Sequence, residues 1–387
     1  MKTLIAACMM AALGLSSVAA HADEVKVGIV ASMTGPFGIW GKEYQEGIEL
    51  FLEQNGNKVG EHTVSVLYRD VGGQNPARAR QLAQDLVVRD GVVAMGGHEL
   101  TPNVLAVTDV INQAKVPFVV FNTGTGNVTD QSPFFVRIGF TQWADYYPLG
   151  KWAAAQGYKR CVAVAADFAP GHDAIAGASK GFVDDGGEII DEILIPVDAT
   201  DFSPYLQRIR DASPECALSF IPYGPSAVSF VKAYVDRGLL RAGIKLLNQQ
   251  EVSEPDLPAM GDGTVGIESA MPYAPYLDTP ENKAFVDAFK AKYGRMPTAI
   301  HLLGYDGMRV MFEMIKATDG KRDGEKMMEA IKGFSWQSPR GPVTIEPDTR
   351  ELTQNIYIRQ VVKEDGVLFN KVIHTYEQMK EPWHIYN

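Results

Sequence analysis

The stretch between Gly91 and Thr125 constrains the fold more than any other part of the sequence. It holds two short apolar runs, 92–95 and 116–121, which flank a helical segment and end in small or hydroxyl residues. Apolar runs of this length around a helix indicate buried parallel strands joined by a crossover. The polar residues that follow each run then lie at the carboxyl edge of the sheet, where open α/β folds bind ligands.

The same alternation of strand and helix occurs in two consecutive series. We expect strands at 25–30, 63–68, 92–95 and 116–121 in the first series, and at 161–166, 188–195, 216–221 and 244–247 in the second. The rest of the chain has helical patterns at 282–293, 299–314 and 324–331 and strand patterns at 341–345, 355–362 and 371–375. The pattern predicts an α/β fold, and a chain of 387 residues favours two lobes over one.

The composition argues against one class of partner. Hydrophobic residues make up 46% of the chain and charged residues 21%, which suits a globular protein with an ample core. The formal net charge is -11, and no basic stripe is available to neutralise phosphates. We therefore expect no nucleic-acid partner.

Residues 1–22 have the features of a secretory signal peptide. Lys2 gives a positive start, an Ala-rich apolar run covers 4–18, and residues 20–22 form a small-x-small cleavage signal. The apolar run is short for a membrane span, and no later segment is long enough for one. We expect an exported protein that is cleaved after Ala22.

Two cysteines remain after this cleavage, Cys161 and Cys216, and each begins a predicted strand. If the two strands are neighbours in register, a disulfide is geometrically feasible in an oxidising compartment. Two buried thiols that pack as small hydrophobes are an equally good interpretation. No group of His and Cys residues has the spacing of metal ligands, so we expect no metal site.

Sequence motifs for catalysis are absent. The pair His98-Glu99 does not begin a zinc-protease motif, because Pro102 stands where the second histidine would be needed. The sequence has no Walker-type loop, no Gly-x-Gly-x-x-Gly turn after the first strand and no Gly-x-Ser-x-Gly elbow. We therefore expect neither an enzyme nor a cofactor, and we assign no catalytic residue.

Residues suited to binding a small ligand occur in the loops after the predicted strands. The first series offers Trp40, Thr101, Asn122, Thr123 and Thr125, and the second offers Phe168, Tyr223 and Glu251. Hydroxyls, backbone N–H groups, a carboxylate and aromatic faces suit a small, partly apolar ligand. Structural interpretations stay open: Trp40 wedges its loop, Tyr223 packs on the next helix, Thr101 caps a helix, and Glu251 is solvated.

Several of these segments together carry a family resemblance. They are Met33-Thr34-Gly35-Pro36 with Trp40-Gly41, 97–101, 122–125 with Val128-Thr129, 167–171, Tyr223-Gly224-Pro225 and Tyr305-Asp306. Each is weak alone, but their order and spacing resemble the exported solute-binding proteins of the branched-chain amino acid (Leu/Ile/Val-binding) class, which feed ATP-driven importers. The resemblance covers essentially the whole mature chain.

The resemblance implies the fold of a type I periplasmic binding protein, with two Rossmann-like lobes that close on a ligand. A three-stranded hinge then joins the lobes, with crossovers near Thr141, Met271 and Gly341. The N-terminal lobe is expected at 23–140 plus 272–340, and the C-terminal lobe at 141–271 plus 341–387. We interpret Arg137, near the first crossover, as a structural ion-pair residue and not as a ligand contact.

The resemblance also implies which residues bind the ligand. In the first lobe, the family's aromatic residue of the first loop corresponds to Trp40, its carboxylate-binding hydroxyl to Thr101, and its carboxylate-binding loop to 123–125. In the second lobe, its aromatic wall corresponds to Phe168 or Ala169 and to Tyr223. Its acidic residue, which binds an ammonium group, corresponds to Glu251 or Gln250. If Glu251 points into the cleft, the ligand needs a cation, as an amino acid has. If Gln250 does, a neutral site favours an aromatic or aliphatic carboxylate.

We therefore expect a monomeric periplasmic receptor for a small carboxylate, whose closed form is recognised by membrane permease subunits. The loop 167–173 departs from the Tyr-Gly form common among amino-acid binders and is similar to family members associated with organic acids. An organic acid, aromatic acids included, is slightly favoured over a hydrophobic or branched-chain amino acid. A ligand-sensing protein of a signalling system is the alternative function.

Overall fold

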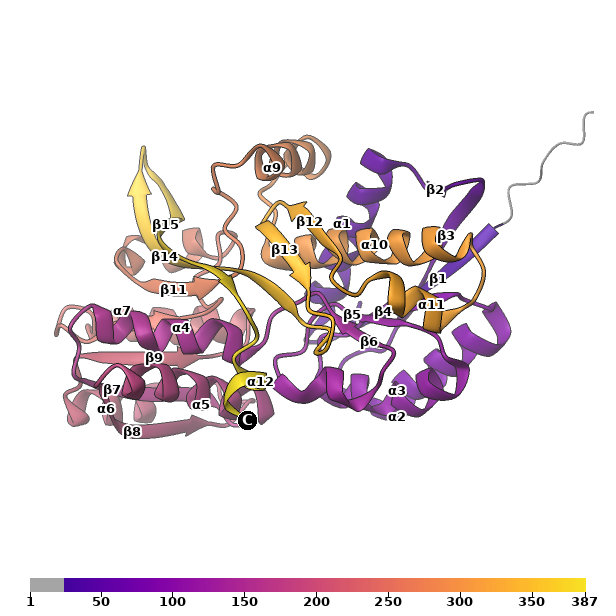
Figure 1. Cartoon of the computed structure of the whole chain (residues 1–387). Helices are drawn as coiled ribbons and strands as arrows, with labels where there is room; N and C mark the ends of the chain where they lie inside the picture. The colour runs from indigo at the N-terminus through magenta and orange to yellow at the C-terminus, as the bar shows by residue number, and fades with distance from the viewer. Residues whose placement is uncertain (1–23) are drawn as a thin grey trace, which may run out of the picture.

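The computed structural model describes residues 24–387, so the predicted signal peptide at 1–22 lies outside the described residues. Two lobes lie side by side, one around a six-stranded sheet and the other around a nine-stranded sheet (Figure 1). Helices cover both sheets, which confirms the predicted α/β fold of two lobes. Within the described range, no helix combines the length and the apolar character that crossing a membrane requires.

The six-stranded sheet has the order β2-β3-β1-β4-β5-β6. Its strands are β1 (Glu24–Ala31), β2 (Lys58–Val59), β3 (His62–Asp70), β4 (Ala94–Gly97), β5 (Phe118–Val120) and β6 (Phe135–Arg137). The short β2 runs antiparallel to β3 at the edge, and the other pairings in this sheet are parallel. The helices of this lobe are α1 (Gly38–Asn55), α2 (Pro76–Gln84), α3 (Thr101–Ala114), α9 (Pro280–Tyr293), α10 (Ala299–Thr318) and α11 (Gly324–Ala330).

The nine-stranded sheet has the order β12-β13-β14-β11-β10-β9-β7-β8, and β15 pairs with β14. Its strands are β7 (Arg160–Ala166), β8 (Glu188–Ile195), β9 (Cys216–Phe220), β10 (Lys245–Asn248), β11 (Glu268–Met271), β12 (Ser335–Ser338), β13 (Gly341–Ile345), β14 (Leu352–Glu364) and β15 (Val367–Met379). The accompanying helices are α4 (Gln142–Ala155), α5 (Ala169–Asp184), α6 (Ser203–Ala212), α7 (Pro225–Asp236), α8 (Leu257–Met260) and α12 (Trp383–Tyr386). From β7 to β11 the pairings are parallel, whereas those of β11 to β15 are antiparallel.

Strand β14 connects the two parts of the molecule. At its start Leu352 pairs with Ile345 of β13, and further along Tyr357 pairs with Met271 of β11. Strands β14 and β15 form one long hairpin, so they are longer than the strand patterns at 355–362 and 371–375. The residue boundaries of the two lobes stay a prediction.

Helix α10 covers the first lobe although it follows the second lobe in the sequence (Figure 1). Glycines stand at its closest approach to α1. A Cβ on Gly47 would lie 1.9 Å from the carbonyl oxygen of His301, and one on Gly304 would lie 2.2 Å from that of Tyr44. Because no side chain fits at these distances, only glycine lets the two backbones approach this closely.

Cys161 and Cys216 are direct partners in the register of β7 and β9. Their Cα atoms lie 4.6 Å apart, and the two side chains form a disulfide. Of the two interpretations that the sequence leaves open, the disulfide is therefore the one that the structure has. It joins two strands of the same lobe.

Candidate ligand-binding site

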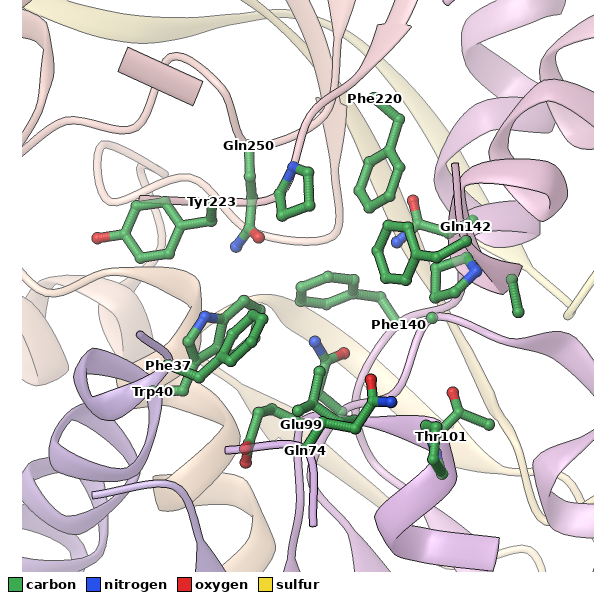
Figure 2. A pocket seen from close by; sticks show the side chains of 18 of the residues that line it. Phe37, Trp40, Gln74, Glu99, Thr101, Phe140, Gln142, Phe220, Tyr223 and Gln250 are labelled. Atoms are coloured by element: carbon green, nitrogen blue, oxygen red, sulfur yellow. The ribbon is translucent and has the colours of Figure 1, made fainter. Parts of the chain in front are cut away.

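A cavity of about 350 Å³ lies between the lobes, and both contribute to its walls (Figure 2). The first lobe contributes Phe37, Trp40, Gln74, Glu99, Leu100, Thr101, Pro102, Leu105, Asn122, Gly124 and Phe140. The second contributes Gln142, Phe168, Ala169, Pro170, Phe220, Pro222, Tyr223, Gln249 and Gln250. Most of these residues lie in the loop after a strand or in the first turn of the next helix, so the convergence of strand ends builds the cavity.

One end of the cavity, which we call the polar end, is formed by Thr101, Gln142 and the first turns of helices α3 and α5. Helix α3 begins at Thr101 and α5 at Ala169, and neither N-terminus is capped by a side chain. The Thr101 hydroxyl lies 3.0 Å from that of Thr125. Pro102 and Pro170, the second residues of the two helices, have no N–H group. The N–H groups of the other first-turn residues and the helix dipole favour an anion at such a place.

The two lobes approach each other closely at the polar end. A Cβ on Gly124 would lie 2.7 Å from Nε2 of Gln142 and 3.1 Å from Cβ of Pro170, and both of these residues belong to the second lobe. The N-termini of α3 and α5, which come from different lobes, thus line the same end of the cavity.

The other end of the cavity, which we call the aromatic end, is formed by Trp40 and Tyr223, with Gln250 beside them (Figure 2). The rings of Trp40 and Tyr223 come from opposite lobes and meet edge to face, with centres 6.1 Å apart. Phe168 and Phe220 stack at 5.9 Å and line the second-lobe wall. These rings offer a flat ligand a large apolar contact area.

The cavity walls contain few ionisable groups. Glu99 and Tyr223 are the titratable side chains among the lining residues, which include no Lys, Arg or His. The Ser32 hydroxyl donates a hydrogen bond to the Glu99 carboxylate, and burial raises the pKa of Glu99 to about 7. Burial likewise raises the pKa of Tyr223. An anionic ligand therefore finds no cation in these walls and has to be held by neutral donors.

Gln250 and Glu251 face different surroundings. The Gln250 side chain extends into the cavity (Figure 2). Glu251 is 1% exposed, and its carboxylate accepts hydrogen bonds from the N–H groups of Ile221, Gln249 and Gln250 and from the Ser219 hydroxyl, at 2.9 to 3.2 Å. Burial raises the pKa of Glu251 to about 7 despite these donors. Glu251 thus ties the end of β9 to the loop after β10 and does not line the cavity.

Thr123 and Thr125 do not line the cavity either. Arg137 binds the backbone of their loop on the side away from the cavity. The guanidinium donates to the Thr123 carbonyl at 2.9 Å and to the Thr125 carbonyl at 2.6 Å. Thr123 is fully buried with a φ of 97°, and the Thr125 hydroxyl reaches the site only through Thr101. Arg137 also pairs with the buried Glu351, which confirms its predicted role in a structural ion pair.

The structure brings six of the predicted residues to the cavity: Trp40, Thr101, Asn122, Phe168, Tyr223 and Gln250. Sequence reasoning missed Phe37, Gln74, Glu99, Phe140, Gln142, Phe220 and Gln249. For two of these the signal was present, since Phe220 ends β9 and Gln249 follows β10 directly. Gln74 and Phe140 stand in irregular segments, whose path the sequence pattern does not define.

Comparisons with known proteins agree with this geometry. Residues 24–366 match the model of the periplasmic binding protein family. The chain is 42% identical to the Leu/Ile/Val-binding protein homolog 6 of Brucella melitensis, over 98% of each chain. It is 41% identical to a solute-binding protein of an ABC transporter from R. palustris, solved in complex with 4-hydroxybenzoate (TM-score 0.90; 94% of this chain and 100% of that chain). A solute-binding protein from Rhodopseudomonas palustris BisB5, in complex with 3,4-dihydroxy benzoic acid, is 38% identical (TM-score 0.89; 94% and 99%).

The chain therefore belongs to the type I periplasmic binding proteins of the branched-chain amino acid transporter family, as its motifs predict. Members of this family are solute-binding transport proteins and not enzymes. The family also implies export to the periplasm and work with an ABC transporter.

Proposed function

We propose that this protein binds an aromatic carboxylate of the hydroxybenzoate type between its lobes and delivers it to the permease subunits of an ABC importer. The observation that carries the proposal is a ring-lined cavity that has no cationic side chain in its walls and two uncapped helix N-termini at one end. A carboxylate suits the N-termini, and a flat apolar ring suits the aromatic walls.

An amino acid suits this cavity less well, because its ammonium group needs a partner. The two nearest carboxylates are already engaged, Glu99 with Ser32 and Glu251 with three backbone N–H groups. A buried ammonium without a counter-charge is costly. The side chain that extends into the cavity at this place, Gln250, is neutral.

In this proposal, different walls of the cavity bind different parts of the ligand. Thr101, Gln142 and the first turns of α3 and α5 hold the carboxylate, while Trp40 and Tyr223 cover the ring. The amide of Gln250 can donate and accept hydrogen bonds, so it suits a hydroxyl substituent at the far end of the ring.

The names of the relatives mention two classes of ligand, aromatic acids and branched-chain amino acids. The two R. palustris proteins were solved with 4-hydroxybenzoate and 3,4-dihydroxy benzoic acid, whereas the Brucella melitensis protein of similar identity is named for leucine, isoleucine and valine. The chemistry of the cavity walls is what favours the aromatic acids for this chain.

Binding and closure are coupled in this proposal. A ligand shifts the balance between open and closed lobes only through a difference in its contacts with the two states. The carboxylate makes that difference, because closing the lobes brings the second helix N-terminus to it. We further propose that the protein acts as a monomer in the periplasm after removal of residues 1–22, and that permease subunits recognise its closed form.

Titration calorimetry on the mature chain tests the function. The ligands are 4-hydroxybenzoate, 3,4-dihydroxybenzoate and benzoate, with leucine and valine as the competing class. We expect the aromatic acids to bind and the amino acids not to. Binding of leucine or valine without binding of any aromatic acid would contradict the proposal.

A further inference from the structure

The tail segment, 381–387, lies between the two lobes (Figure 1). After β15 the chain forms the short helix α12, which packs against the 3₁₀ helix η2 (Gly126–Gln131) of the first lobe and reaches α4 and α5 of the second. The match to the family model ends at residue 366, so this segment lies outside the region that identifies the family.

Trp383 is the contact between the tail segment and the first lobe. Its indole packs so closely on Gly126 that a Cβ there would lie 2.2 Å from the ring. Gly126 does not have a positive φ, so the packing and not the backbone requires glycine. The next residue, His384, lies 4.0 Å from Glu351, the carboxylate that pairs with Arg137.

Three contacts attach the tail segment to the second lobe. The Tyr386 hydroxyl lies 2.6 Å from that of Tyr147 on α4, and the Lys180 ammonium lies 4.6 Å from the centre of the Tyr386 ring. The Thr141 hydroxyl, at the start of α4, donates to the Glu381 carboxylate at 2.7 Å. The tail segment therefore contacts both lobes.

The tail segment does not line the cavity, but it contacts a loop that does. We call residues 122–126 the ligand loop, which contributes Asn122 and Gly124 to the cavity wall. Arg137 binds this loop from below and donates to the Gly126 carbonyl at 2.9 Å. The Gly126 N–H donates at 3.1 Å to the Asp173 carboxylate on α5 of the second lobe. The ligand loop is thus fixed by Arg137, by the second lobe and by the tail segment.

We propose that Trp383 is a positioning residue for ligand binding, which holds the ligand loop in the conformation that lines the cavity. Trp383 is not among the residues that line the cavity, so it acts through Gly126. Without the indole, the loop spends part of its time in conformations that do not bind, and affinity falls by that fraction. The affinity part of this inference rests on the proposed function, whereas the effect on the loop does not.

The first test needs no ligand. Amide hydrogen exchange is measured on ligand-free wild type, on Trp383→Ala and on Ile385→Ala, a matched control on the same helix whose side chain is 60% exposed. We expect faster exchange at 123–126 in Trp383→Ala, with β1 and β7 unchanged, and wild-type exchange in the control. Unchanged exchange in the ligand loop would overturn the proposal.

The second test measures affinity by calorimetry with 4-hydroxybenzoate. We expect Trp383→Ala to bind about tenfold more weakly, Trp383→Phe to restore most of the affinity, and Ile385→Ala to match wild type. A merely structural role would lower the melting temperature and leave Kd unchanged, and this result would overturn the proposal. If wild type binds none of the aromatic acids, the proposed function fails while the exchange result still decides the role of Trp383.

Gly126→Ala approaches the same contact from the other side, and it serves if Trp383→Ala does not fold. The added Cβ displaces the indole, so we expect faster exchange in the ligand loop and weaker binding in this variant as well. In the double variant Gly126→Ala/Trp383→Ala the clash is gone, so the loss should be no larger than that of Trp383→Ala alone. Losses that simply add would show that the two residues do not act through one contact.

Discussion

In the proposed function the two ends of the cavity bind different parts of the ligand, and neither end offers a cationic side chain. At the polar end the donors are Thr101, Gln142 and the N–H groups of two helices, whereas the aromatic end offers rings and one amide, that of Gln250. Acids lie near the cavity, but protein groups already bind Glu99 and Glu251. In the proposed function, therefore, backbone N–H groups contribute much of the affinity for an anion, and the hydrogen bonds of Glu99 and Glu251 to protein groups make the site less attractive to a cation.

The largest expected effect concerns the two engaged acids. Burial raises the pKa of Glu99 and of Glu251 from 4.5 to about 7. Since each group has a higher pKa in the folded state than in the unfolded state, the folded protein binds more protons. Each group therefore contributes its whole share of the unfolding free energy below pH 4.5, and this contribution is lost as the pH rises through 7. Glu99→Gln should remove about 3 kcal/mol of this pH dependence of the unfolding free energy.

Urea denaturation at pH 5 and pH 8 measures this change. The exposed Glu61 gives a control, Glu61→Gln, which should keep the wild-type dependence. Equal dependence in Glu99→Gln and wild type would show that Glu99 is not held neutral by the fold.

At the aromatic end, Trp40→Ala should weaken binding of benzoate and 4-hydroxybenzoate alike, by about 2.5 kcal/mol, because the ligand loses one wall of its apolar contact. Calorimetry with both acids measures this loss. Trp152→Ala is the control, since Trp152 lies outside the cavity lining. Wild-type affinity in Trp40→Ala would mean that the ring binds elsewhere.

At the polar end, Thr101→Val keeps the shape of the side chain and removes its hydroxyl. If the hydroxyl donates to the carboxylate, benzoate affinity should fall by about 2 kcal/mol, the value typical of a hydrogen bond to a charged group. Thr108→Val is the matched control on the same helix, because the Thr108 hydroxyl has no partner within residues 24–387. Equal calorimetric affinities for the two variants would exclude Thr101 from the site.

The smallest expected effect sharpens the aromatic end. Gln250→Met should reduce the preference for 4-hydroxybenzoate over benzoate by about 1 kcal/mol, because a neutral hydrogen bond to the ring hydroxyl is lost. Benzoate serves as the internal control, and its own affinity should change little. If the preference for 4-hydroxybenzoate over benzoate does not change, Gln250 does not recognise the ring hydroxyl.

Periodicity in the sequence predicts the lobes and part of the site for the same reason. Trp40, Thr101 and Tyr223 follow strands of βαβ units, and parallel strands end at one edge, so their approach to a common cavity follows from the order of elements. The choice between Gln250 and Glu251 does not follow from it. Glu251 turns inward because the Ile221 N–H, 30 residues earlier in the chain, lies within reach of its carboxylate, and that contact exists only in the folded protein.

The end of the chain was harder to predict. Apart from the buried Asn370, the residues of strand β15 are partly buried or exposed in no regular order, because the strand pairs with a single neighbour at the outside of the sheet. A strand pattern depends on one buried face, so only the segment 371–375 was visible in the sequence. The tail segment makes contacts between residues more than 200 positions apart, such as Thr141 and Glu381, and no local pattern encodes them.

The disulfide between Cys161 and Cys216 cross-links two adjacent strands inside one lobe. In the proposed function, capture and release depend on movement of one lobe against the other, and a cross-link inside one lobe does not restrain that movement. Its effect falls on the denatured chain, whose freedom it limits across a separation of 55 residues. If the proposed function holds, the redox state of the surroundings therefore affects the stability of the folded protein and not the choice of its ligand.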